Sequence, residues 1–167
     1  MTGKWTSILI GALTYVLLGT LMSAFGSGAG GFAAILSCLV IILSAMVAVW
    51  HYTNTNTATI SGGEGAGMGA VVGLIGAVIA GILGYFLISM GAIPDPMDTA
   101  MQQMRDQGLT EEQIEQSMGM AEAFSSPVIG IAIGAVFGLI GGAIGGAIGA
   151  AVFKKGGPEP TTNEPIV

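Results

Sequence analysis

The sequence predicts an all-α membrane protein with four transmembrane helices and an extramembrane helical hairpin. Its 167 residues are 52% apolar and only 8% charged, whereas about a quarter of the residues in a soluble domain are charged. Four apolar stretches also contain no Asp, Glu, Lys, Arg or His, and roughly 20 such residues cross about 30 Å of hydrocarbon. Disordered chains have the opposite composition, so disorder of the whole chain is excluded.

The predicted membrane helices cover residues 5–25, 32–50, 66–90 and 128–153. Backbone groups in lipid must bond within their own segment, and the apolar residues do not alternate as they do in a barrel, so helices are expected. The first stretch could instead be a signal peptide, because Ser23 and Ala24 are small. However, it is longer than the usual core of 7–15 residues and only Lys4 precedes it. We expect residues 1–155 to form a single domain and residues 156–167, rich in Pro, Thr and Glu, to be disordered.

The few cations predict the orientation. An even number of spans places both termini on one side, together with Lys4, Lys154 and Lys155, and the positive-inside rule makes that side cytoplasmic. The loop of residues 92–127 then lies outside. It holds seven acidic residues against Arg105, so the whole net charge of −6 falls in this loop. Such a surface favours cations and basic partners and excludes nucleic acid as a partner.

The third and fourth spans resemble each other. Residues 68–86 read MGAVVGLIGAVIAGILGYF and residues 133–151 read IGAVFGLIGGAIGGAIGAA, which share GAVxGLIG at an offset of 65. This identity favours a duplication, although two solutions to one packing problem would look similar.

Glycines recur at four-residue spacing or its multiples in both spans, and this predicts helix packing. The residues are Gly69, Gly73 and Gly81 in the third span and Gly130, Gly134, Gly138, Gly142 and Gly146 in the fourth. Lipid gives helices no hydrophobic reason to associate, so small residues that allow close backbone contact hold them together. We expect antiparallel packing of the two helices with each other or with copies in a second protomer. A glycine-lined pore is the alternative, but the predicted spans lack the ionisable groups that transporters usually need.

Two helices are predicted in the outer loop, over about residues 95–124, and we call them the outer hairpin. Asp95 is an expected N-cap before Pro96, and Gly108 ends the first helix. Thr110 and Gln113 form a capping box that opens the second, as Ser61 and Glu64 do for the third span. The apolar faces, expected to meet a partner, consist of Met97, Met101, Met104, Ile114, Met118 and Phe124.

No catalytic, cofactor-binding or metal-binding residue is assigned, so no enzyme is predicted. The methionine thioethers could hold Cu(I), but no His or Cys accompanies them, and an adaptable apolar face is the favoured interpretation. His51 stands alone between Trp50 and Tyr52 and is interpreted as a membrane-interface residue. Cys38 lies in mid-span and is expected to be a buried, inert thiol.

Residues 107–120, which read QGLTEEQIEQSMGM, followed by Phe124 and Pro127, are similar to the outer loop of a bacterial membrane-protein family. This family, mostly from Bacteroidota, is catalogued as domain of unknown function 4199 (DUF4199). The resemblance implies four spans and a helical loop before the last span. We expect the bacterial inner membrane as the location, with both termini cytoplasmic. The resemblance brings no functional residues. The chain departs from its relatives around residues 51–63, where Asn, Thr and Gly replace basic residues.

The sequence therefore supports two classes of function. The leading hypothesis is a non-enzymatic structural or accessory subunit that packs through glycine helices and presents an acidic hairpin to a partner. The alternative is a small oligomeric channel or transporter, and Cu(I) binding by the hairpin is a weaker third hypothesis.

Overall fold

The computed structural model describes residues 3–25, 30–124 and 126–153, and no strand occurs in these ranges. Its helices are α1 (Lys4–Phe25), α2 (Gly30–Asn56), α3 (Gly62–Ser89), α4 (Pro96–Asp106), α5 (Glu111–Phe124) and α6 (Pro127–Val152). Four of them, α1, α2, α3 and α6, are long and apolar enough to cross a membrane. The predicted all-helical, four-span fold is confirmed. The tail of residues 156–167 lies outside the described residues.

One boundary differs clearly from the prediction, because α2 continues to Asn56 rather than ending near residue 50. Polar side chains extend the helix by bonding its own carbonyls: Thr53 Oγ1 donates to Val49 at 3.0 Å and Asn56 Nδ2 donates to Tyr52 at 3.0 Å. The helix ends where Thr57 adopts a left-handed conformation, with φ 49°. As a result, His51 belongs to a membrane-length helix.

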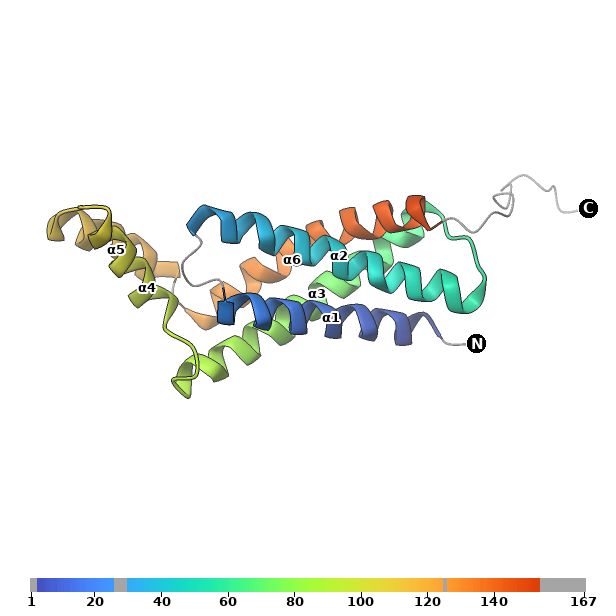
Figure 1. Cartoon of the computed structure of the whole chain (residues 1–167), viewed down its shortest axis with the longest axis horizontal. Coiled ribbons are helices and arrows are strands. Elements are labelled where there is room, and N and C mark those ends of the chain that lie inside the picture. Colours follow the sequence, from blue (N-terminus) through green and yellow to red (C-terminus); the bar gives the residue numbers. More distant parts are fainter. Residues whose placement is uncertain (1–2, 26–29, 125, 154–167) are drawn as a thin grey trace, which may run out of the picture.

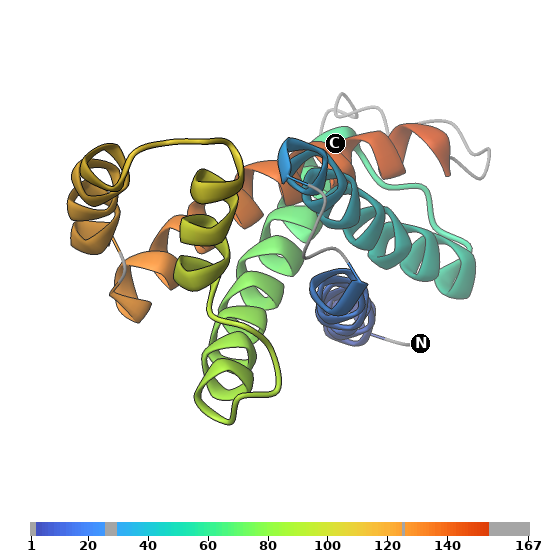
Figure 2. The same cartoon turned by 60° about the vertical axis from the view of Figure 1, so that its left-hand side comes forward.

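The long helices form an antiparallel bundle (Figure 1). α1 and α3 begin at one end of the bundle, where α2 and α6 finish, and α4 and α5 project from the opposite end. The most extensive contact joins α3 to α6, and α2 packs on α6 while α1 packs on α2 and α3. Figure 2 shows that α3 and α6 cross and then diverge toward the end that carries the hairpin.

The core of the bundle is thin and built from small side chains. Its largest fully buried residues are Val49, Val72, Thr53, Ser7 and Ser44. Large apolar side chains point outward instead, as with Leu9, Leu13, Leu17 and Leu21, which follow one face of α1 and are each more than half exposed. A water-soluble fold would bury this surface, so lipid is its natural surrounding.

The helix starts follow the local signals in the sequence. Ser61 and Glu64 form the expected capping box of α3, Asp95 caps α4 through a 2.8 Å bond to the Met97 amide, and Thr110 pairs with Gln113 before α5. Gly108 lies at φ +78°, a conformation that glycine adopts without a steric penalty, and the chain turns there from α4 into α5.

Candidate functional site

The contact between α3 and α6 is made by opposed glycines, which we call the glycine seam: Gly65, Gly69 and Gly73 of α3 and Gly138, Gly142 and Gly146 of α6. Gly65 faces Gly146, Gly69 faces Gly142 and Gly73 faces Gly138. A Cβ added at any of the six would collide with the backbone of the opposite helix. The two backbones therefore touch, in antiparallel register, over two helical turns on each side.

The seam stops before the helices end. The next glycines of the predicted series in α6 are Gly134 and Gly130, and a Cβ added at either would lie in open space. A Cβ added at Gly81 of α3 would meet the Ile131 side chain rather than a glycine. The stripe over residues 130–146 thus has two parts within one chain. Gly138, Gly142 and Gly146 contact α3, whereas Gly130 and Gly134 belong to the part of α6 that diverges from α3.

Other glycines bring the remaining helices close. Gly145 and Gly149 of α6 face α2 at Ile42 and Met46, while Gly11 of α1 approaches Ser44 and Ala48 of α2. Gly76 of α3 lies under the ring of Tyr15. Gly11 and Gly76 were not predicted as packing residues, because neither has a glycine four residues before or after it in its helix.

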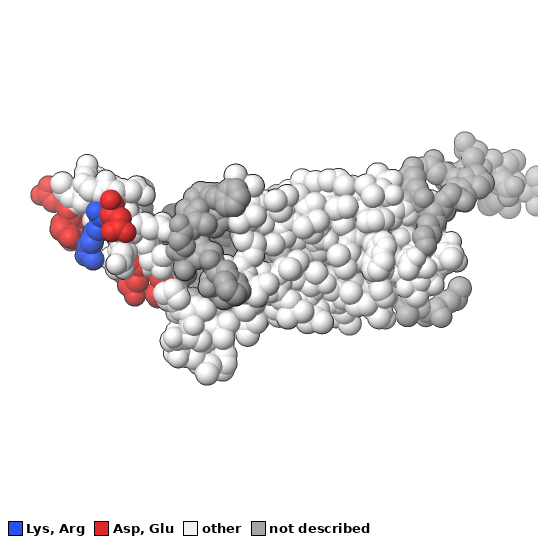
Figure 3. Space-filling view, in the orientation of Figure 1, with Lys and Arg blue, Asp and Glu red and all other residues white. Residues whose placement is uncertain are grey.

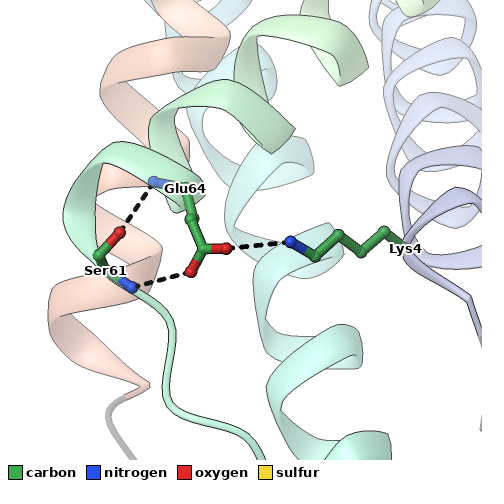
Figure 4. A network of polar contacts seen from close by, with 3 residues as sticks. All are labelled: Lys4, Ser61 and Glu64. Atoms are coloured by element: carbon green, nitrogen blue, oxygen red, sulfur yellow. Dashed lines mark hydrogen bonds and ion pairs between the residues drawn. The ribbon is translucent and has the colours of Figure 1, made fainter. Parts of the chain in front are cut away.

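A polar network ties α1 to α3 at the end where both begin (Figure 4). Lys4 Nζ lies 3.0 Å from Glu64 Oε1, with both side chains about half exposed. The other carboxylate oxygen of Glu64 accepts from the Ser61 amide at 3.4 Å, and Lys4 Nζ also lies 5.8 Å from the centre of the Tyr52 ring. A single lysine thereby joins the starts of two helices.

The interpretation of His51 as a lone residue is wrong. Its Nδ1 lies 2.9 Å from Ser7 Oγ, across the interface of α2 and α1, and Ser7 is fully buried. Sequence reasoning missed the pair because 44 residues separate its members. The sequence feature that comes closest to indicating this pair is the spacing of polar residues on the buried faces of α1 and α2.

The outer hairpin is acidic. Figure 3 shows its acidic side chains gathered at one end of the molecule, and the rest of the described surface on this face carries no charged side chain. Asp98, Asp106, Glu111, Glu112 and Glu115 are exposed, and Arg105 pairs with Glu111 at 3.3 Å. In the described residues α4 and α5 pack on each other and make no extensive contact with the bundle.

The apolar residues of the hairpin, predicted to face a partner, are less exposed than that prediction requires. Ile114, expected to face a partner, is only 3% exposed, because the short hairpin must build its own core. Met97, Met101, Met104 and Met118 are half-buried. The side chain of Phe124 lies outside the described residues.

Two further expectations concern metal ligands and thiols. Within the part of the chain that the structure describes, no group of three His, Cys, Asp or Glu side chains could hold a metal ion. Cys38, expected to be buried, is exposed, because it lies on the face of α2 that points away from the other helices.

These features define a class: a small, all-helical, four-span membrane protein with a charged helical hairpin outside the bundle. A family model described as "Protein of unknown function (DUF4199)" matches residues 4–155. The chain belongs to this family, as its sequence suggested. No curated protein and no solved structure matches the chain.

Proposed function

We propose that this protein is a non-enzymatic accessory subunit of a membrane complex, whose bundle anchors it while its outer hairpin contacts a partner. The observation that supports this most is the separation of the two parts. Among the described residues of the bundle only Lys4 and Glu64 are charged, and they pair with each other, whereas the hairpin is acidic and makes no extensive contact with the bundle. A segment that stabilised the bundle would pack against it.

Charge indicates the chemistry of the partner. The five exposed carboxylates within the described part of α4 and α5, at Asp98, Asp106, Glu111, Glu112 and Glu115, have one cation among them, Arg105. Such a surface attracts a basic segment over a Debye length of roughly 8–10 Å and repels anionic headgroups. The proposed partner therefore presents lysine or arginine side chains close to the membrane.

The proposed location is the inner membrane, with the hairpin on the outer side. Lys4 lies at the end of the bundle opposite the hairpin, and basic residues favour the cytoplasmic side.

Native mass measurement after mild detergent extraction tests the proposal. We expect the wild-type chain to migrate with a larger complex. A variant with the five exposed carboxylates of α4 and α5 changed to Asn or Gln should migrate as the free chain or a small oligomer. Glu64→Gln, which removes a carboxylate at the other end, is the matched control and should keep the complex. An unchanged mass in the hairpin variant would refute the role of the hairpin. Steady conductance from the purified chain in vesicles would favour a channel instead.

A further inference from the structure

The connection between α2 and α3 lies at the end of the bundle opposite the outer hairpin (Figure 1), and we call its residues 57–61 the strap. Although it is a short loop, the strap is anchored in the core. Its Ile60 side chain is buried and belongs to a cluster with Val49 of α2, Met68 of α3 and Ala150 of α6. One loop residue therefore holds three helices together.

The first residue of the strap has a backbone conformation that does not suit it. Thr57 is exposed and lies at φ 49°, where the Cβ of an L-residue crowds the following carbonyl, and β-branched residues rarely adopt this conformation. Such strain persists only where the surrounding structure imposes it. Ile60 imposes it here, because its buried side chain fixes the path of the strap three residues after Thr57.

The last residue of the strap belongs to the polar network that reaches α1 (Figure 4). Ser61 and Glu64 form the capping box of α3, with Ser61 in an extended conformation. The Glu64 carboxylate accepts from the Ser61 amide at 3.4 Å and lies 3.0 Å from Lys4 Nζ. The orientation of Glu64 toward α1 therefore depends on where the strap places Ser61.

We propose that the strap is a strained latch between the start of α1 and the rest of the bundle. In the closed state, which the structure shows, Ile60 keeps Thr57 at positive φ and Ser61 in position to cap α3. In the released state Ile60 leaves its cluster, Thr57 relaxes to negative φ, and the Lys4–Glu64 contact is lost together with the cap. The latch is independent of the proposed accessory function and of the outer hairpin.

Hydrogen exchange of the full-length protein in nanodiscs tests the latch, because backbone amides exchange when their local structure opens. Ile60→Ala should raise exchange by roughly tenfold or more in the strap and in the first turns of α3 and α1, since it removes the buried anchor. Thr57→Gly should lower exchange in the same segments by a factor of roughly two to five, because glycine adopts positive φ without the steric cost.

Two matched variants serve as controls. Thr57→Val keeps a β-branched side chain at the same exposed position and should exchange like the wild type. Ile82→Ala shortens an isoleucine of α3 that points away from the other helices, and it should change exchange neither in the strap nor at the start of α1.

Three results would overturn the proposal. Faster exchange of the strap in Ile60→Ala, with the start of α1 unchanged, would show that the strap does not control the contact between α1 and α3. A rise spread evenly over the four long helices would make Ile60 an ordinary core residue. Exchange in Thr57→Gly that is as fast as in the wild type, or faster, would show that Thr57 stores no strain.

Discussion

At the scale of single residues, the position of a glycine along α6 determines its structural role. Gly142 touches the backbone of α3 at Gly69, whereas Gly134, two turns earlier in the same stripe, has open space beside it. Both residues lower the helix propensity of α6. Only Gly142 compensates for that cost through a contact within the chain.

Alanine substitutions at these two glycines should therefore have opposite effects. Gly142→Ala should destabilise the bundle by about 1–3 kcal/mol, because the added methyl group forces two packed backbones apart. Gly134→Ala should be neutral or stabilising by at most about 1 kcal/mol. Unfolding of the reconstituted protein by a denaturing detergent measures both free energies. Equal effects of the two substitutions would contradict the assigned packing.

The Lys4–Glu64 ion pair should contribute little to stability in spite of its short distance. Both side chains are about half exposed, and exposed pairs are typically worth less than about 1 kcal/mol. A double-mutant cycle with Lys4→Met and Glu64→Gln measures the coupling between them. A coupling well above this value would show that lipid shields the pair from water.

At the scale of elements, sequence patterns predicted most of the fold. The four apolar stretches and the capping residues Ser61, Asp95 and Thr110 marked the helices because these signals are local. The extension of α2 was missed, since Thr53 and Asn56 continue a helix only by bonding its own carbonyls. The Ser7–His51 pair and the exposure of Cys38 depend on which helices become neighbours, and no local pattern contains that information.

The outer hairpin should behave as a separate unit. Ile114 is its buried residue, at 3% exposure, so Ile114→Asp should unfold α4 and α5 by placing a charge in their small core. Limited proteolysis should then cleave the hairpin much faster than in the wild type, while the detergent-unfolding transition of the bundle should shift little. Loss of the bundle's stability in this variant would show that the two parts are coupled.

In the whole molecule, the bundle and the hairpin have different surfaces: the bundle exposes apolar side chains and the hairpin exposes charged ones. The helices bury few and small side chains and leave their large apolar residues to lipid, so backbone contact along the glycine seam takes the place of a hydrophobic core. The charges of the described residues are concentrated in the hairpin, where they are exposed. Two of the five glycines of the predicted stripe, Gly130 and Gly134, have open space where a Cβ would be added, within the part of the chain that the structure describes.

We propose that the acidic hairpin and the start of α1 lie on opposite faces of the membrane, with the hairpin outside. Single cysteines at Gln102 in α4 and at Thr55 near the end of α2, both exposed, can be introduced after Cys38→Ala and treated with a membrane-impermeant maleimide in intact spheroplasts. Gln102→Cys should react at once and Thr55→Cys only after the membrane is opened. Equal labelling of both positions before opening, or the reverse order, would contradict the layout and with it the proposed role of the hairpin.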